Sequence, residues 1–550
     1  MIHISLSSSI KNIDVTVDTS CKIEDLLPLI EYKHPIYLAK LDNAYRSLSH
    51  IITHDCKIEL LDITNNAAWL SYQDSLSFLY MKAVHDIMGK DCLVTINNSL
   101  SKGLFTVINP KPSKSQLRKI TKRMKDISLM NIPIKKVYMS KKEALQLCES
   151  QKLKETKELL ESIPSIKDIE IYSLDDEIGI FYNLLVPSTK YLQQFELVPY
   201  KNGVILRYPH PTNPLIIPEY KEESLLYEAF KQANKWSKLM NVNYIADLNN
   251  CVNKGDYKDL ILLQEALHEK NIADIASTIS KTKTRIVLIC GPSSSGKTTF
   301  ANRLKIQMQT IGLNALYLGS DDYFKDLKDR AYLPDGQPDL ESINAVDTEL
   351  LFNQIDKLIK FEEVDIPIFD FALSKKVFVQ RKTRLQKNQV IILEGIHCLN
   401  PLITKQLEKY KLFKIYISPL TPLAIDHHNR IPTTDARMLR RLVRDTKYRN
   451  RSPIKALKEW VNVRTGEDEN IFPYNDEADC FFNSNCLYEL SVLKKYAVDL
   501  LKQIDRSNPE YAEAQRILRF LKYIVDLDDE SYILNNSIIR EFIGGSIILS

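Results

Sequence analysis

The stretch that decides the fold is IVLICGPSSSGKTTF, residues 286–300. Its apolar opening predicts a strand, its small residues predict a loop, and the residues from Lys297 onward predict a helix. Within the loop, Gly291, Gly296, Lys297 and Thr298 satisfy the pattern G-x-x-x-x-G-K-[ST] of the phosphate-binding P-loop. The glycines let successive backbone N–H groups turn toward phosphate oxygens, with the helix dipole behind them. The stretch therefore predicts that the chain binds a nucleoside triphosphate.

Each part of this loop has an expected role. Lys297 should reach the β- and γ-phosphates, and the Thr298 hydroxyl is placed to ligate Mg²⁺. The alternative is an ordinary Gly/Ser turn, and the flanking strand and helix argue against it. The expected ATP-binding residues of the loop are Gly291, Pro292, Ser293, Ser294, Ser295, Gly296, Lys297, Thr298 and Thr299.

The composition of the 550-residue chain is typical of globular proteins, with 44% hydrophobic and 26% charged residues. This length predicts several domains. The net charge of +4 favours neither nucleic acid nor membrane as a partner. The nine cysteines are scattered without a C-x-x-C pair, which indicates reduced thiols rather than a disulfide framework or a zinc site. Because no apolar run reaches membrane-spanning length and no signal peptide is visible, we expect a cytoplasmic protein without a membrane partner.

The patterns along the chain divide it into five segments. Residues 1–63 alternate as two strands, a short helix and two further strands, which predicts a small β-grasp domain. Residues 64–215 predict an α+β domain, and residues 216–280 predict a helical connector. Residues 281–490 predict an α/β P-loop domain, with a parallel sheet and helices on both faces. Residues 491–550 predict a helical C-terminal tail.

The two N-terminal segments resemble parts of aminoacyl-tRNA synthetases. Residues 1–63 are similar to the TGS domain of threonyl-tRNA synthetase and some GTPases. Residues 64–215 resemble the editing domain of threonyl- and alanyl-tRNA synthetases, through an amphipathic helix over residues 72–84 and the Val-Pro-Ser-Thr segment at residues 186–189. The positions of the histidines and cysteine of those editing enzymes hold Asp74, Phe78, Phe181 and Leu185. Since phenylalanine and leucine cannot ligate a metal or move a proton, we expect no editing chemistry.

The segment between residues 111 and 142 is rich in basic side chains. They are Lys114, Arg118, Lys119, Lys122, Arg123, Lys125, Lys135 and Lys136. One interpretation is an RNA-binding face, because basic clusters supply affinity for phosphates. The other is a solvated helix, which the apolar stripe of Leu117, Ile120, Met124 and Ile127 favours.

Residues 284 to about 490 resemble the uridine kinase and phosphoribulokinase family. After the P-loop a second strand leads into residues 320–324, Ser-Asp-Asp-Tyr-Phe, and Asp322 falls at the family's catalytic carboxylate. A carboxylate there would orient the acceptor hydroxyl and take its proton. We favour Asp322, and Asp321 stays open as its competitor. A third strand ends at Glu394, which the resemblance implies supports Mg²⁺, directly or through water.

The residues that bind the acceptor are expected between these two strands. Glu341 falls where an aspartate of the family binds the ribose hydroxyls, and a carboxylate can accept hydrogen bonds from both. Residues 367–371, Pro-Ile-Phe-Asp-Phe, match the family's Pro-x-Tyr-Asp-Phe with Phe369 in place of tyrosine, and stacking could survive that change. The histidine that touches the pyrimidine base falls at Ser374, so the resemblance leaves base recognition open.

Residues 437–451 match the family's lid pattern, Arg-x-x-Arg-Arg-x-x-Arg-Asp-x-x-x-Arg-x-Arg, without a gap. On a helix the first four arginines share one face, where they repel one another unless an anion lies among them. The triphosphate would supply that anion, and a nucleic-acid face is the runner-up interpretation. The resemblance implies catalytic roles for Arg444 and Arg451, an ATP contact for Arg449, and substrate contacts for Arg441 and Arg444.

Together these residues predict an ATP- and Mg²⁺-dependent nucleoside kinase that phosphorylates a 5′-hydroxyl, with uridine or cytidine as expected acceptors. A related alternative keeps the phosphotransfer but uses another sugar or small alcohol. A second class is an RNA-associated regulatory ATPase, in which the N-terminal half binds tRNA or senses a ligand. The sequence leaves open whether the chain forms a homo-oligomer.

Overall fold

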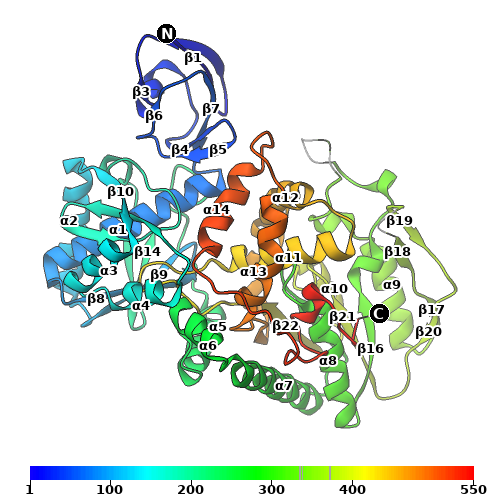
Figure 1. Cartoon of the computed structure of the whole chain (residues 1–550). Helices are drawn as coiled ribbons and strands as arrows, with labels where there is room; N and C mark the ends of the chain where they lie inside the picture. The colour runs from blue at the N-terminus through cyan, green and yellow to red at the C-terminus, as the bar shows by residue number, and fades with distance from the viewer. Residues whose placement is uncertain (333–335, 337, 371–372, 550) are drawn as a thin grey trace.

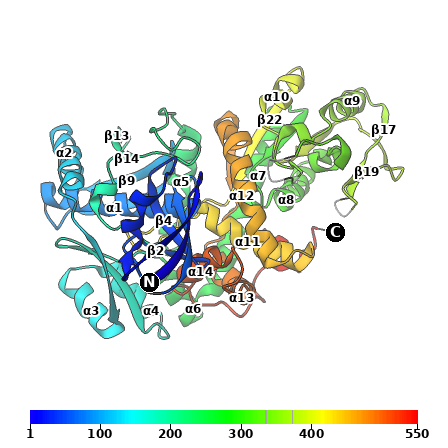
Figure 2. The ribbon, with the colours of Figure 1, turned by 90° about the horizontal axis from the view of Figure 1, so that it is seen from above.

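The computed structural model describes residues 1–332, 336, 338–370 and 373–549, and Figure 1 shows their arrangement. The N-terminal sheet lies at one end of the molecule, and the C-terminal helices lie between the N-terminal half and the P-loop sheet (Figures 1 and 2). Every helix among these residues is too short or too polar to cross a lipid bilayer.

The first unit is a five-stranded mixed sheet with the order β2-β1-β7-β4-β5. Its strands are β1 (Ile2–Ser7), β2 (Asn12–Val17), β4 (Ile36–Leu41), β5 (Ala44–Arg46) and β7 (Cys56–Asp62). A two-stranded ribbon joins β3 (Cys21–Lys22) to β6 (Ile51–Ile52), and the helical turn η1 (Ile23–Leu29) follows β3. Ile23 and Leu26 of η1 pack against alternate residues of β1 such as Ile4 and Leu6, which closes a small core of its own.

The second unit packs two long helices on an antiparallel sheet of order β13-β14-β9-β8. Its first elements are α1 (Asn66–Met88), β8 (Leu93–Leu100), β9 (Gly103–Asn109), α2 (Lys114–Met130), β13 (Glu196–Tyr200) and β14 (Gly203–Arg207). A second, three-stranded sheet contains β10 (Ile134–Ser140), β11 (Asp168–Leu174) and β12 (Glu177–Gly179), next to α3 (Lys141–Ser150) and α4 (Lys154–Ser162). The short turn η2 (Thr189–Tyr191) precedes β13.

Helix α1 corrects one prediction. The sequence predicts an amphipathic helix over residues 72–84, but α1 is buried on nearly every side from Ala67 to Val84. A helix that is enclosed all round carries small and polar residues wherever a neighbour approaches closely, so polar positions do not mark a solvent face. The buried Ser75 and Ser77 hydroxyls return their hydrogen bonds to carbonyls one turn back, at Ser71 and Gln73.

Three helices connect the second unit to the P-loop unit. They are α5 (Ser224–Leu239), α6 (Ile245–Lys254) and α7 (Tyr257–Lys281). Apolar residues of α6 and α7, among them Ile245 and Ile261, belong to the same hydrophobic core as α4 and the P-loop helix, whereas Ala229 and Phe230 of α5 pack with Leu420 in a smaller cluster. The connector is therefore packed as part of the globular body.

The P-loop unit contains the predicted parallel sheet, which the structure confirms, with the order β16-β21-β15-β22-β23. Its strands are β15 (Ile286–Cys290), β16 (Asn314–Gly319), β21 (Gln389–Glu394), β22 (Leu412–Ser418) and β23 (Cys480–Asn483). Val287 and Ile289 face one core, and Ile286, Leu288 and Cys290 face another. Because β15 is apolar on both faces, helices must cover the sheet on both sides.

The helices divide between these two faces. Helix α8 (Lys297–Thr310) shares the first core with α11 (Thr433–Tyr448) and α12 (Pro453–Asn470). Helices α9 (Thr348–Ile359) and α10 (Pro401–Leu407) share the second core. Short elements complete the unit: η3 (Ser320–Tyr323), η4 (Leu327–Asp329), η5 (Ile343–Ala345), β17 (Glu363–Asp365), β18 (Ile368–Asp370), β19 (Lys375–Val377), β20 (Lys382–Arg384) and η6 (Phe472–Glu477).

The last segment of the chain folds back over the P-loop and the lid helix α11. It contains α13 (Glu489–Lys502), α14 (Tyr511–Leu521) and α15 (Arg540–Ile543). Ile538 packs on the P-loop at Gly296, and the Lys447 ammonium of α11 donates to the carbonyl of Ile543. The N-terminal sheet also docks on this segment, where Asn43 Nδ2 donates to the carbonyl of Arg506 (3.1 Å).

Candidate active site

Three adjacent strands bring the predicted donor residues to one edge of the sheet. Strand β21 lies between β15 and β16, and all three run parallel. The P-loop follows β15, Asp321 and Asp322 follow β16, and Glu394 is the last residue of β21. Because the carboxyl ends of parallel strands meet at one edge, residues that are about a hundred positions apart in sequence converge there.

The P-loop glycines are required by backbone geometry. Gly296 has φ +84°, in the left-handed region, and a Cβ on it would lie 2.6 Å from Cγ2 of Ile538. Gly291 passes so close to β22 that a Cβ would lie 2.1 Å from the carbonyl oxygen of Ile417. The loop thus reaches its conformation only with glycine at both positions.

Glu394 is the centre of the network at the start of α8. Its carboxylate accepts hydrogen bonds from the Tyr317 hydroxyl (2.8 Å) and the Thr298 hydroxyl (3.3 Å), and Lys297 Nζ lies 3.9 Å away. Burial raises the pKa of Glu394, and the charge of Asp321 raises it further while Lys297 opposes the shift. Neighbouring carboxylates and a hydroxyl form the oxygen donor set that suits Mg²⁺, so Thr298 and Glu394 fit that ion.

The two aspartates after β16 face different neighbours. The Asp322 carboxylate accepts a hydrogen bond from Arg381 (3.2 Å), and burial raises its pKa against the influence of that arginine. Asp321 is exposed to solvent in the site, and the positive charges that act on it belong to Lys297, Arg449 and Arg444. Asp321 therefore faces the P-loop and the lid, whereas Asp322 faces the β18–β20 side of the site.

The lid arginines fall into two groups, which corrects one expectation. Arg437 makes a two-pronged ion pair with Glu467 of α12, and Arg440 pairs with Glu489 of α13. All four of these side chains are at most 1% exposed. The anions that neutralise Arg437 and Arg440 are therefore carboxylates of this chain, and these two arginines anchor α11 to its neighbours.

The second group keeps an excess of positive charge. Arg441 and Arg444 lie 3.4 Å and 2.9 Å from oxygens of Asp445, and Arg449 lies 3.7 Å from it. Arg451 pairs with Glu459, which Arg441 also approaches to 3.4 Å. Partial burial and the nearby Arg444 guanidinium lower the pKa of Arg449. Arginines that crowd together in this way would gain from a polyanion among them.

Two acidic residues that the sequence analysis did not single out accept hydrogen bonds from N–H and hydroxyl groups of the P-loop. The Glu467 carboxylate accepts from the backbone N–H of Ser293 (3.2 Å). The Glu541 carboxylate of α15 accepts from the hydroxyl of Thr299 (2.7 Å) and from its backbone N–H (3.4 Å). Both acids lie far from the loop in sequence and outside any motif, so no local signal could have identified them. Tyr317, which holds Glu394, and Arg381, which holds Asp322, were missed for the same reason.

The predicted acceptor residues lie on the other side of the site. Glu341 packs on α12 at Gly466, where a Cβ would lie 2.3 Å from Glu341 Cβ. Burial and the charge of Glu467 raise the pKa of Glu341 to about 8. Phe369 is 5% exposed and packs against the Phe324 ring, with centroids 5.7 Å apart.

The acceptor motif has two further positions, Ser374 and Phe371. The Ser374 carbonyl accepts from the backbone N–H of Leu327 (3.1 Å), and its φ of +48° is left-handed. Phe371, the last residue of the predicted motif, lies outside the described residues.

The four positions aligned with the editing enzymes do come together in the second unit. The rings of Phe78 and Phe181 pack with centroids 5.1 Å apart, and both side chains and Leu185 are at most 1% exposed. Asp74 accepts a hydrogen bond from Asn183 (2.9 Å), and burial raises its pKa to about 6. Aromatic packing fills the space between these positions, and they have no part in the P-loop site.

Comparison with known proteins matches this part of the chain. The family described as "Phosphoribulokinase / Uridine kinase family" matches residues 286–489. A uridine kinase of Anoxybacillus flavithermus is 29% identical over 195 residues, which cover 35% of this chain and 83% of that protein. A uridine kinase of Staphylococcus aureus (strain JH9) is 30% identical over 197 residues, 36% of this chain and 86% of that protein.

A solved structure described as a possible uridine kinase from Bacillus stearothermophilus covers 39% of this chain and 98% of its own, at 20% identity and a TM-score of 0.26. Through residues 286–489, the chain is a kinase of the phosphoribulokinase/uridine kinase family.

Proposed function

We propose that this protein transfers the γ-phosphoryl group of ATP to the 5′-hydroxyl of a nucleoside, with uridine and cytidine as the expected acceptors. One observation carries the proposal: Asp321 lies under the combined field of the P-loop Lys297 and the lid residues Arg444 and Arg449. Cations from two separate elements, the P-loop and the lid, thus act on the same carboxylate at the edge of the sheet. A transferring phosphoryl group needs this convergence of positive charge.

In the donor half, the P-loop amides and Lys297 bind the β- and γ-phosphates. Arg444, Arg449 and Arg451 stabilise the charge that develops on the transferring group, because the lid holds more guanidiniums than carboxylates to pair them. Mg²⁺, held by Thr298 and Glu394, would neutralise phosphate charge in the bound state.

In the acceptor half, Asp322 orients the 5′-hydroxyl and takes its proton as the oxygen attacks phosphorus in line. Its raised pKa makes it a stronger base than an ordinary aspartate, and Arg381 fixes the direction of the carboxylate. Glu341 and Arg441 bind the ribose side of the acceptor. Phe369 forms part of the acceptor pocket and is held in place by its packing on Phe324.

The test is phosphate transfer from radiolabelled ATP to a panel of nucleosides, sugars and small alcohols. We expect the 5′-monophosphate of uridine or cytidine as the product. Asp322→Asn should lower kcat by about 10² to 10⁴ with little change in ATP affinity. Asp321→Asn should chiefly weaken the binding of Mg²⁺-ATP, and Asp329→Asn, at an exposed aspartate of η4, is the matched control.

Each alternative from the sequence predicts a different result. If the protein phosphorylates a sugar or alcohol but no nucleoside, it is a kinase with a different acceptor. An RNA-associated ATPase would turn over no acceptor, would hydrolyse ATP equally well with Asp322→Asn, and would bind total tRNA in a salt-sensitive way. The nucleoside kinase assignment fails on either result.

A further inference from the structure

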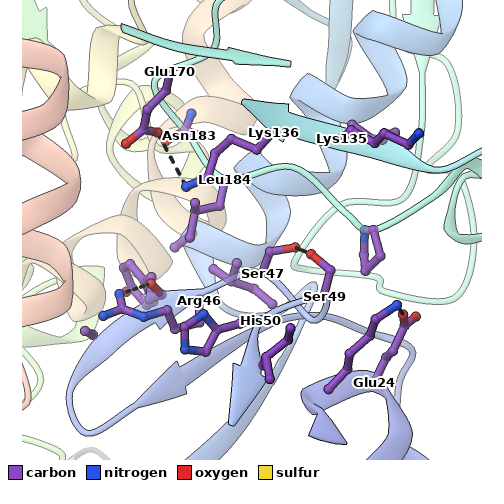
Figure 3. A pocket seen from close by; sticks show the side chains of 18 of the residues that line it. Glu24, Arg46, Ser47, Ser49, His50, Lys135, Lys136, Glu170, Asn183 and Leu184 are labelled. Carbon is purple, nitrogen blue, oxygen red and sulfur yellow. Dashed lines mark hydrogen bonds and ion pairs between the residues drawn. The ribbon is translucent and has the colours of Figure 1, made fainter. Parts of the chain in front are cut away.

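A large cleft lies outside the kinase site, where the N-terminal sheet meets the second unit and α14. Its volume is about 1410 Å³, and its lining comes from residues 22–51, residue 67, residues 131–190 and residues 506–519. Figure 3 shows Arg46, Ser47, Ser49 and His50 on one wall, with Lys136 and Glu170 on the wall that faces it. A cavity of this size at a junction of three chain regions is a common place for a ligand.

The lining of the cleft is strongly basic. Its basic residues are Lys22, Arg46, Lys135, Lys136, Lys190, Arg506, Arg516 and Arg519. Its acidic residues are Glu24 and Glu170. The whole chain is close to electrical balance, with 74 basic and 70 acidic residues. The imbalance is therefore local to the cleft.

Some of these cations are already paired. Lys22 and Lys190 both approach Glu24, at 3.5 Å and 3.6 Å. Arg516 donates two hydrogen bonds of 2.8 Å to the buried carboxylate of Asp435. These residues hold the walls of the cleft and are not available to a ligand.

The remaining cations share too few carboxylates. Arg519 and Lys136 approach the same residue, Glu170, and Arg506 approaches Asp42 at 4.0 Å. Within the described parts of the chain, no ion pair joins Arg46 or Lys135 to a carboxylate.

The cations of the cleft also act on one another. Burial lowers the pKa of Arg46, and the like charges of Arg506 and Arg519 lower it further. The pKa of His50 is lowered by burial and by Arg46 and Lys136. Guanidiniums that converge from separate elements repel one another until an anion enters between them.

The fold holds this repulsive arrangement in place. Asn43 Nδ2 donates to the carbonyls of Arg506 and Ser507 (3.1 Å each), and Arg506 Nε donates to the carbonyl of Asp42 (3.2 Å). These contacts clamp the N-terminal sheet to the segment before α14. The cations therefore cannot separate without undocking the sheet.

Neutral groups complete the lining. Asn183 is 3% exposed and lines the cleft, and its Oδ1 has no hydrogen-bond partner among the described residues. Tyr138, on the exposed strand β10, is 62% exposed, and Tyr511 lies on the α14 side. An unused acceptor and the exposed Tyr138 ring suit a heterocyclic base, which carries amino groups and a flat π-surface.

We propose that this cleft is a second ligand site and that it binds a nucleoside di- or triphosphate. The cations converge on one region, as a compact polyphosphate requires, whereas a nucleic-acid strand needs cations spread along a groove. The phosphates would lie among Arg46, Arg506 and Arg519, beside Lys135 and Lys136. The base would lie toward Asn183 and a tyrosine ring.

The test uses the full chain with Lys297→Ala, which weakens the P-loop. Calorimetric titrations with ATP, GTP, CTP, UTP and inorganic pyrophosphate should detect one remaining site, whose affinity falls as salt rises. Adding Arg46→Ala and Lys135→Ala should weaken that site about tenfold or more. Lys135→Ala with Lys136→Ala, both at exposed residues of β10, should do the same without a risk to folding.

The matched control is Lys119→Ala with Lys122→Ala, which removes the same charge from exposed residues of α2 outside the cleft. Its affinity should equal that of the parent chain. The proposal is overturned if no nucleotide binds to the Lys297→Ala chain, or if both cleft variants bind nucleotide with the affinity of the parent chain. It is also overturned if pyrophosphate alone or a single-stranded RNA oligonucleotide binds through the cleft residues while nucleoside polyphosphates do not.

Discussion

Replacing Glu341 by glutamine should stabilise the nucleotide-free protein at pH 9 and change its stability little at pH 5. Glu341 packs on Gly466 of α12, and burial and the charge of Glu467 raise its pKa to about 8 from the ordinary value of 4.5. The folded state therefore binds this proton more tightly than the unfolded state does. The contribution of Glu341 to the free energy of unfolding therefore falls as the pH rises from 4.5 to about 8, and it is constant above that pH.

The size of the effect follows from this difference in proton affinity. A tenfold change in affinity is worth about 1.4 kcal/mol, so a pKa of about 8 against 4.5 sets an upper limit near 5 kcal/mol. Because part of the Glu341 side chain still meets solvent, screening reduces this, and we expect about 2 kcal/mol at pH 9. Glutamine has nearly the same shape and never ionises, so it escapes this cost.

The assay is thermal unfolding at pH 5, 7 and 9, followed through the transition that Mg²⁺-ATP shifts, since a chain of several units unfolds in more than one step. Glu341→Gln should raise that transition by a few degrees at pH 9. Glu349→Gln, at an exposed residue of α9, is the control and should change nothing. An equal gain at pH 5 and pH 9, or a loss at pH 9, would refute the electrostatic argument.

Three other variants probe the P-loop and the lid. Gly291→Ala places a Cβ 2.1 Å from the Ile417 carbonyl and should weaken ATP binding more than tenfold in calorimetry; an unchanged Kd would contradict the required close approach. Glu541→Gln removes the charge that occupies Thr299 and should tighten ATP binding by about threefold to tenfold, whereas weaker binding would show that this carboxylate helps the nucleotide. Arg516→Ala leaves a buried carboxylate of α11 unpaired and should cost about 3 to 5 kcal/mol in denaturant unfolding, so a loss below 1 kcal/mol would refute its anchoring role.

The parts of the fold that the sequence predicts are those with a local signal. Strand β15 is apolar on both faces, and a parallel strand covered by helices on two sides has that pattern. The P-loop is readable because its glycines are needed for the backbone itself, at Gly291 and Gly296. Helix α1 has no such signal, since a helix enclosed on all sides lacks the apolar stripe of a surface helix.

The candidate site was predictable only in its outline. Glu394 is visible because an acid ends an apolar run, whereas Asp322 is singled out only by the resemblance to the family, which leaves the adjacent Asp321 open. The residues that hydrogen-bond to these carboxylates, Arg381 and Tyr317, cannot be identified from the sequence, because each hydrogen bond spans more than fifty residues and depends on the fold. Glu541 is an extreme case, since it reaches Thr299 from 242 residues away.

The lid shows why a matched motif does not assign equal roles to its residues. Arg437 and Arg440 are sealed against Glu467 and Glu489, and their charge is already balanced before any nucleotide arrives. They fix the position of α11, so their loss should unfold the lid rather than change the chemistry.

The later arginines of the lid have the opposite arrangement. Arg441, Arg444 and Arg449 all approach Asp445, which can balance only one of them, and the last of the three is 52% exposed. A site that must bind a triphosphate and then release a diphosphate needs cations of both kinds. The buried, paired arginines hold the helix in place, and the arginines that share Asp445 keep positive charge available to bind the phosphates.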